Sequence, residues 1–439
     1  MAEQAIRGIR RYTPRAHPVS WVMLVITTLA IVINSIDRII LPTVLPGIIS
    51  EFNLNATEGG FLVSLSFVGT TIGAIILGTL GDSFGKGPRR AWMWAATVGV
   101  VIIAAVGTAI SNTLNQLRAL RVLMGIGTGS MEPVNVTMVG EWWQKEDRGF
   151  AVGTHHTGFP IGQFVGPLLI GAIVATATWR EAFLFIPLIA IPIVILQIIF
   201  ARRRNLERVN AWIEAHRMTP SLREEEIEAK RWENPFGRFK EALFSDRNVA
   251  LGVVTNFLFL WTETGVISFL TYQLTRDVGL SLSAASVISG ASGLTGWIGQ
   301  VGWGTVSDHK GRKYSLYILA IGGAIALFAM IFITSSALAW IILIGWGLVR
   351  NSPYPVLYAA VIDTVPDAAS SGLGLMIGLG LGASGILAPT VQGYLVDNFG
   401  FTVHYLVLGA ICLLTLIPIS LLRQRAETGG GTREVQAEG

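Results

Sequence analysis

Charged residues are scarce in this chain of 439 residues: Asp, Glu, Lys and Arg together supply 14% of the sequence. Ordinary soluble domains carry about 25% charged residues, so this deficit excludes a typical soluble protein. Hydrophobic residues supply 51% of the chain, and its mean hydropathy is +0.57. The net charge of +4 does not indicate a nucleic-acid partner, because the basic residues lie between apolar runs. The composition predicts a polytopic helical membrane protein.

Cysteine is nearly absent as well. The one cysteine, Cys412, lies in an apolar run, so the sequence excludes an internal disulfide and a cysteine metal cluster. No cleavable signal peptide is visible, since a basic N-terminus leads directly into a full-length apolar run. No metal-ligand cluster, nucleophile constellation or attached soluble domain favours an enzyme or a receptor. We therefore expect no enzyme activity, no metal and no cofactor beyond a coupling ion.

Apolar runs of about 20 residues, the length that crosses a bilayer, recur along the chain. We count twelve, near residues 20–49, 58–80, 91–110, 114–138, 149–176, 180–201, 248–275, 283–306, 314–335, 337–361, 370–396 and 401–422. Between the sixth and seventh runs lies a polar stretch with eleven Lys or Arg and nine Asp or Glu. The sequence thus predicts an N-terminal six-helix bundle (1–201), a cytoplasmic linker (202–247) and a C-terminal six-helix bundle with a short polar tail (248–439).

The distribution of basic residues predicts the orientation, because cytoplasmic loops of membrane proteins are enriched in Lys and Arg. If the N-terminus is cytoplasmic, the outside loops contain little basic charge beyond Arg180 and Arg276. The inside loops and the tail then hold the central linker and Lys86, Arg89, Arg90, Lys145, Arg148, Lys310, Arg312, Lys313, Arg423, Arg425 and Arg433. We expect both termini to be cytoplasmic and the plasma membrane to be the location.

One loop pattern occurs twice. Gly78-Thr-Leu-Gly-Asp82-Ser-Phe-Gly85-Lys86 is repeated 226 positions later as Gly304-Thr-Val-Ser-Asp308-His-Lys-Gly311-Arg312. Each copy follows the second apolar run of its half. Such a duplication predicts two halves of like design, with a binding site between them near the bilayer midplane.

These two loops resemble the signature loop of the major facilitator superfamily. Two further stretches resemble its fourth and fifth helices, namely Arg121-Val-Leu-Met-Gly125-Ile-Gly127-Thr-Gly129 and the spaced residues Gly158, Gly162, Gly166-Pro167 and Gly171. The resemblance implies an all-α fold of twelve transmembrane helices in two pseudo-symmetric halves. It also implies gating roles at the loops for Asp82, Arg90, Asp308 and Arg312, with simple helix capping as the alternative for the two aspartates.

Within that superfamily, Asp37-Arg38 and Trp142-Trp143-x4-Arg148 resemble the organic anion:cation symporters, which include sugar-acid, glutamate and sialic-acid carriers. Phe269-Leu-Thr-Tyr272-x7-Leu280-Ser-Leu282 is similar to the seventh helix of that group. One position departs from its pattern. The group has a fourth-helix glutamate seven residues after the arginine, where this chain has Thr128, and Glu132 follows one turn later. Whether Glu132 takes over the coupling role of that glutamate stays open.

Intramembrane charges are few. The bases are Arg38, Arg121 and Arg350, and the acids are Asp37, Glu132 and Glu263. Guanidinium groups bind carboxylate oxygens in bidentate fashion, so arginines that converge on one cavity would form an anion site. Internal Arg–Asp pairs and snorkelling of Arg38 are the alternatives. Asn351 and Tyr354 follow Arg350 at a break set by Pro353 and Pro355, and we expect them to line the site.

The three acids are candidate proton carriers, because burial raises the pKa of a carboxyl group whereas a neighbouring arginine lowers it. Adding the repeat offset to Asp37 gives Glu263, whereas Arg38 is matched by Thr264. The sequence therefore predicts a monomeric symporter of a small organic anion (a carboxylate, sugar acid or sulfonate), coupled to protons or to sodium ions. The alternative is an exporter or exchanger of hydrophobic, drug-like or cationic compounds that uses Asp37 and Glu263.

Overall fold

The computed structural model describes residues 14–84, 88–220, 247–364 and 376–423, and in this part of the chain the secondary structure is helical apart from one isolated bridge. The first half contains α2 (Pro18–Phe52), α3 (Ala56–Phe84), α4 (Pro88–Ala109), α5 (Leu114–Glu141), α6 (Arg148–His156), α7 (Gly158–Val174), α8 (Trp179–Phe185), η1 (Pro187–Ile189), α9 (Ala190–Phe200) and α10 (Arg203–Ala215). The second contains α13 (Arg247–Arg276), α14 (Leu282–Ser289), α15 (Ala291–Lys310), α16 (Arg312–Ala329), η2 (Met330–Phe332), α17 (Ser336–Arg350), α18 (Pro353–Thr364), the π-helix η4 (Met376–Leu381), α20 (Gly382–Leu414) and α21 (Leu416–Leu421).

Helices overlap all twelve apolar runs that the sequence predicts. Seven helical stretches are long and apolar enough to cross a membrane by length and composition, within the residues described. Several runs are divided by short breaks, as between α6 and α7, α14 and α15, and α17 and α18. The last two runs meet inside α20, where Gly400 adopts φ 75°, a backbone conformation that glycine tolerates far better than other residues.

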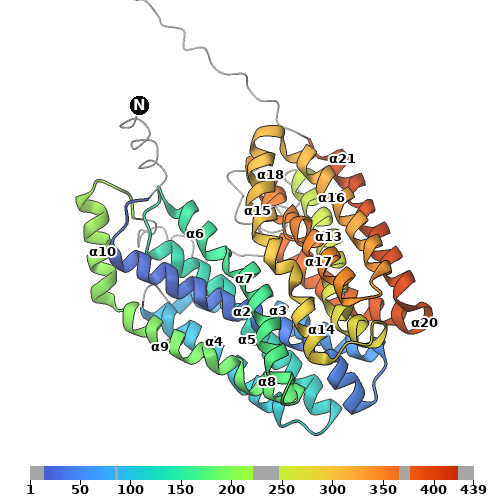
Figure 1. Ribbon diagram of the computed structural model, residues 1–439. Coiled ribbons are helices and arrows are strands. Elements are labelled where there is room, and N and C mark those ends of the chain that lie inside the picture. The colour runs from blue at the N-terminus through green and yellow to red at the C-terminus, as the bar shows by residue number, and fades with distance from the viewer. Residues whose placement is uncertain (1–13, 85–87, 221–246, 365–375, 424–439) are drawn as a thin grey trace, which may run out of the picture.

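The helices form two bundles, α2–α9 and α13–α21 (Figure 1). The bundles approach each other where α8 and α14 lie and separate toward the end where α6 and α18 lie (Figure 1). We call the end at which α2 begins and α9 leads into α10 the linker end, and the end that contains Phe52, Ala56 and Gly400 the far end. Direct contacts across the bundles include α3 with α20, α2 with α13, and α7 with α14 and α15.

Close helix packing depends on small residues, as is usual between membrane helices. A Cβ atom on Gly125 of α5 would lie 2.1 Å from the carbonyl oxygen of Ser66 in α3, so no side chain fits there. The same applies between the bundles at Gly60 of α3, whose Cβ would lie 2.2 Å from the carbonyl oxygen of Pro389 in α20. Backbone-to-backbone packing therefore occurs both within and between the bundles.

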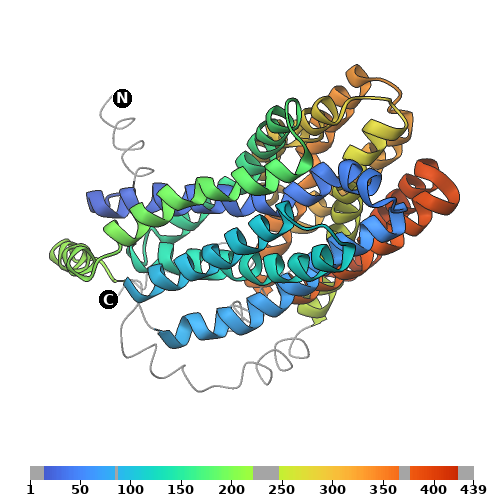
Figure 2. The same cartoon turned by 90° about the horizontal axis from the view of Figure 1, so that it is seen from below.

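The predicted linker contains a helix that the sequence analysis did not identify. Val209 and Ile213 of α10 are buried, and the Trp212 ring lies 6.2 Å from the His17 ring at the start of α2. After α10, the carbonyl of Thr219 accepts a hydrogen bond of 2.9 Å from the amide of Lys145. Figure 2 shows α10 set across the linker end of the first bundle. The rest of the predicted linker (221–246) and the polar tail with Arg425 and Arg433 lie outside the described residues.

The α3–α5 contact yields a prediction for stability. Gly125→Ala should lower the free energy of unfolding by about 1–3 kcal/mol, because the added methyl group forces two backbones apart. Gly99→Ala in α4 is the matched control, since a Cβ atom there meets nothing within 4 Å. Chemical denaturation of the purified protein in detergent measures both changes. Equal losses in the two variants would contradict the packing described here.

Candidate functional site

A small cavity lies between the two bundles. Its apolar walls are side chains from both bundles, with Trp346 of α17 on one side and Pro167 of α7 on the other. Its polar lining includes the amide of Gln163, the hydroxyls of Thr43 and Thr271, and Arg350. A second cavity lies within the second bundle and shares Trp346 and Arg350 with the first.

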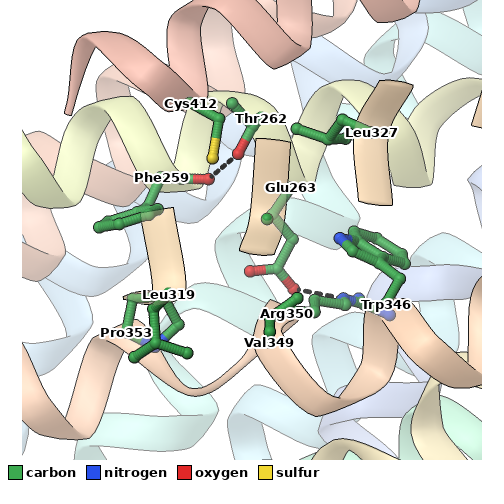
Figure 3. A pocket seen from close by; sticks show the side chains of 11 residues that line it. Phe259, Thr262, Glu263, Leu319, Leu327, Trp346, Val349, Arg350, Pro353 and Cys412 are labelled. Carbon is green, nitrogen blue, oxygen red and sulfur yellow. Dashed lines mark hydrogen bonds and ion pairs between the residues drawn. The ribbon is translucent and has the colours of Figure 1, made fainter. Parts of the chain in front are cut away.

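Arg350 is the last residue of α17 and lines both cavities. Figure 3 shows it in the cavity within the second bundle. Its Nε donates to Oε1 of Glu263 in α13 at 2.9 Å, and its Nη1 donates to the hydroxyl of Ser292 at 2.7 Å. The Trp346 ring centroid lies 4.8 Å from the guanidinium carbon. The Tyr354 hydroxyl donates to the other oxygen of Glu263. The Arg350 and Glu263 side chains are 5% and 10% exposed, so this is a buried ion pair with further hydrogen bonds.

Arg38 forms the corresponding ion pair in the first bundle. Its Nη2 donates to Oε2 of Glu132 in α5 at 3.1 Å, and the two side chains are 23% and 19% exposed. One turn away on both helices, the Asn34 amide donates to the carbonyl of Thr128 at 3.0 Å. The four-residue step from Asn34 to Arg38 matches the step from Thr128 to Glu132, so α2 and α5 are joined along one face.

The two ion pairs have opposite polarity. In the first bundle the base is on the first helix and the acid on the fourth, whereas in the second bundle Glu263 is on the first helix (α13) and Arg350 on the fourth (α17). Tyr358 of α18 interacts electrostatically with both Glu132 and Glu263. The two acids thus lie near one tyrosine, and the sequence analysis did not single out that residue.

Asp37 is buried beside Arg38 in the sequence but is not bonded to it. The residue is 4% exposed, and its Oδ1 has no hydrogen-bond partner among the residues that the structure describes. The alternative of an Asp37–Arg38 pair is therefore not what the structure contains, since Arg38 turns to Glu132 instead. Asp37 and Glu263 hold equivalent positions in the repeat but have different surroundings.

Arg121 lies apart from the other two arginines. Its guanidinium carbon is 4.5 Å from the Phe183 ring centroid in α8, and the group donates to the Thr108 hydroxyl and to Sδ of Met124, the latter at 3.2 Å. The residue is 1% exposed. Of the three intramembrane arginines, Arg350 lines the cavity between the bundles, Arg38 is paired with Glu132 in the first bundle, and Arg121 is buried inside the first bundle. The Arg121 side chain turns toward α4 and α8.

Asn351 and Tyr354 lie at the break between α17 and α18, as predicted, but neither is among the residues that line the two cavities. The Asn351 amide donates to Oε1 of Gln163 at 2.8 Å and so connects the two bundles. Gln163 and Ser292 were missed by the sequence analysis. An amide within the glycine-rich fifth run was the available signal for Gln163, whereas Ser292 carries no signal that separates it from other small residues of membrane helices.

Two of the predicted gating residues, Arg90 and Arg312, each form an ion pair within their own bundle. Nε of Arg90 lies 3.2 Å from Oε1 of Glu141, with 4% and 2% of the two side chains exposed. Arg312 forms an ion pair with Asp308 four residues earlier and donates to the Ser307 hydroxyl at 2.7 Å. Asp82 lies in α3, and its side chain is outside the described part of the structure.

The sequence of this chain is similar to known transport proteins. The sequence model of the Major Facilitator Superfamily matches residues 27–376 and 249–438. The chain belongs to this superfamily. It is 24% identical to the cis,cis-muconate transport protein of Acinetobacter baylyi over 90% of this chain and 93% of that protein. It is 23% identical to the benzoate transport protein of the same organism, over 93% and 90% of the two chains.

Solved structures show the same superfamily fold. The crystal structure of a D-xylose–proton symporter superposes with a TM-score of 0.70 at 16% identity and covers 91% of this chain and 97% of that chain. The superfamily and these relatives are transporters, and the muconate and benzoate transport proteins are named for small organic acids. This superfamily chain thus holds two arginine–carboxylate pairs between or beside its two bundles.

The two ion pairs differ in burial, so replacing their arginines should lower the free energy of unfolding by different amounts. Arg350→Met should lower the free energy of unfolding by about 3–5 kcal/mol, because it leaves the Glu263 carboxylate buried without its cation. Arg38→Met should cost about 1–2 kcal/mol, since its pair is partly exposed. Denaturation in detergent measures both losses.

The double variant Arg350→Met/Glu263→Gln is the internal control for this prediction. Removing both charges should recover part of the stability lost in Arg350→Met, because the uncompensated carboxylate is gone. Equal losses for Arg38→Met and Arg350→Met, or no recovery in the double variant, would contradict the assignment of Arg350–Glu263 as the buried pair.

Proposed function

We propose that this superfamily member is a symporter that carries a small organic anion together with a proton, with sodium as the alternative coupling ion. One observation carries the proposal: both arginines near the space between the bundles are already bonded to carboxylates, Arg38 to Glu132 and Arg350 to Glu263. A site that binds carboxylate side chains to arginine is suited to bind a carboxylate substrate in the same way.

The anion site in this proposal is the cavity between the bundles. Arg350 supplies the charge, Gln163 and Thr43 supply neutral hydrogen-bonding groups, and Trp346 and Pro167 supply apolar walls. Arg38 completes the site from α2, and Asn351 and Tyr354 hold Gln163 and Glu263 in place. Arg121 is omitted because it packs against Phe183 inside the first bundle. The names of the muconate and benzoate transport proteins are those of carboxylates, the class of anion that this proposal assigns to the site.

Coupling follows from competition for arginine. When a substrate carboxylate binds Arg38, it displaces Glu132, and a carboxylate that loses its cation in a partly buried site favours the protonated form. The same exchange at Arg350 would release Glu263, with Tyr358 near both acids. Asp37, buried with an oxygen that lacks a partner in the described residues, is the third candidate proton carrier. Proton uptake and anion binding then occur together.

The transport cycle in this proposal is alternating access by rocking of two halves, 1–201 and 248–439, joined by the 202–247 linker. Each half contributes six membrane spans, the linker end faces the cytoplasm with both termini, and the protein works as a monomer in the plasma membrane. The bundles are close at the far end and separate toward the linker end (Figure 1). In this proposal that arrangement is the cytoplasm-facing state. The predicted gates at Asp82, Arg90, Asp308 and Arg312 would close the linker end in the opposite state.

Replacement of either site arginine tests the anion site. Arg38→Ala and Arg350→Ala should each lower uptake of an accepted carboxylate by more than about a hundredfold, because the charge-assisted bonds to the anion are lost. The assay is uptake into liposomes by the purified protein, with size-exclusion profiles to confirm folding. Arg276→Ala at the exposed end of α13 is the matched control. Normal uptake by both site variants would disprove the site as drawn.

Glu132→Gln tests the coupling step. The neutral amide cannot carry a proton, so uptake driven by a pH gradient should fall to the rate without the gradient, while exchange of labelled for unlabelled substrate continues. Accumulation that still follows the imposed pH gradient in Glu132→Gln would remove this residue from the coupling mechanism. Replacing the pH gradient by a sodium gradient in the same liposomes distinguishes the two coupling ions.

A second candidate is an exporter or exchanger of cationic or hydrophobic compounds, which the buried and unpaired oxygen of Asp37 favours. Two arginines near the cavity oppose the binding of cations there. Counterflow of labelled against unlabelled substrate, run once with benzoate and once with a quaternary ammonium compound, separates the two functions, because each function predicts exchange of only one class.

A further inference from the structure

A side chain outside the predicted site joins the two bundles at the far end. Asp397 of α20 accepts hydrogen bonds from the backbone amides of Ala56 at 2.8 Å and Thr57 at 2.7 Å, and from the Thr57 hydroxyl at 2.6 Å. Ala56 and Thr57 are the first two residues of α3, so their amides are among the donors that a helix cannot pair internally. One carboxylate thus receives three bonds from the opposite bundle, and Figure 2 shows α20 beside the start of α3.

The start of α3 also has a local cap. Oδ1 of Asn55 accepts from the Glu58 amide at 2.8 Å, and Oε2 of Glu58 accepts from the Asn55 amide at 3.1 Å. This reciprocal pair satisfies the amides of Asn55 and Glu58, whereas the amides of Ala56 and Thr57 donate to Asp397. The bonds to Asp397 therefore add a contact between the bundles to the local cap.

The repeat supplies an internal comparison. Moving Ala56 and Thr57 by the offset of 226 gives Leu282 and Ser283 at the start of α14, and moving Gly171 by the same offset gives Asp397. The equivalent contact is present, since the Ser283 hydroxyl donates to the Gly171 carbonyl at 2.8 Å. It is one neutral hydrogen bond, because Gly171 has no side chain. The two halves thus close the far end through two equivalent contacts, of which only the α3–α20 contact is charged.

A charged acceptor at a helix N-terminus is stabilised by the helix dipole and forms stronger bonds than a neutral acceptor. These bonds require the bundles to be in contact at the far end. If the far end opens during transport, Asp397 must release three donors, whereas the contact at Ser283 releases one. The α3–α20 contact therefore has a larger effect on the population of the far-end-closed state than the contact between Ser283 and Gly171 has.

We propose that Asp397 is a positioning residue of the transport cycle, a latch that holds the far end closed by binding the start of α3. This inference rests on the proposed alternating-access mechanism, but not on the identity of the anion or of the coupling ion. Loss of the latch shifts the population toward the state that is open at the far end.

The experiment measures access to the α3–α20 contact with a membrane-impermeant maleimide added to the purified protein. The reporter is Ser64→Cys in α3, since Ser64 is 3% exposed and its hydroxyl lies 2.9 Å from that of Thr390 in α20. Asp397→Asn should raise the labelling rate of this reporter about tenfold or more, because the charged bonds are lost. Asp397→Glu should keep part of the protection.

Two controls make the result specific. Asp277→Asn removes a carboxylate at the same end of the molecule that is paired with its neighbour Arg276, and it should leave the labelling rate unchanged. Ser283→Ala should raise labelling less than Asp397→Asn does, because it removes one neutral bond. The natural Cys412 is 2% exposed and serves as an unfolding control in protein without the reporter.

Labelling of the reporter at the parent rate in Asp397→Asn would overturn the proposal. An equal rise at Cys412 would also overturn it, since the substitution would then act on folding. The readout needs no substrate, so failure of the latch and failure of the anion-symport function give different results: the first changes labelling, the second changes uptake.

Discussion

An arginine side chain between membrane helices requires partners that compensate its charge, and this requirement organises the centre of the molecule. A guanidinium group in a low-dielectric environment keeps its charge, so nearby charged, polar or aromatic groups must stabilise it. Arg38 is neutralised by Glu132 and Arg350 by Glu263. In each bundle the pair joins the first helix to the fourth. The same two bonds therefore stabilise the bundles and define the groups that a substrate anion would have to displace.

Arg121 shows another solution to the same requirement. It is buried in the first bundle, where the Phe183 ring and the Thr108 hydroxyl surround its guanidinium group. An aromatic face and neutral acceptors stabilise the cation less than a carboxylate does. Arg121 is thus part of the packing between α4, α5 and α8.

The two halves share the order and packing of their helices but not the polar residues at equivalent positions. Thr128 and Glu132 of α5 correspond to Tyr354 and Tyr358 of α18 at the offset of 226, and Gly171 corresponds to Asp397. Helix order and packing are preserved between the halves, whereas the polar residues at equivalent positions differ. As a result, the ion pairs have opposite polarity, and the two contacts that close the far end differ in charge. This asymmetry gives each half a separate role in a cycle that moves both.

The sequence by itself determined the class of protein, the positions of the helices and the list of intramembrane charges. These follow from local properties: a run of about 20 apolar residues forms a helix in a bilayer whatever its neighbours are, and a charge within it stands out. Family membership followed from loop motifs that are read in the same local way.

Only the tertiary structure decided which charges meet. Arg38 is next to Asp37 in the sequence yet binds Glu132, 94 residues away, because the rotation of α2 against α5 aims its side chain there. Arg121 and Glu132 are about three turns apart on α5, yet they contact different helices. Gln163 and Asp397 acquire roles only through partners in the other bundle. Such pairings depend on helix rotation and on the distance between bundles, which hydrophobic periodicity does not specify.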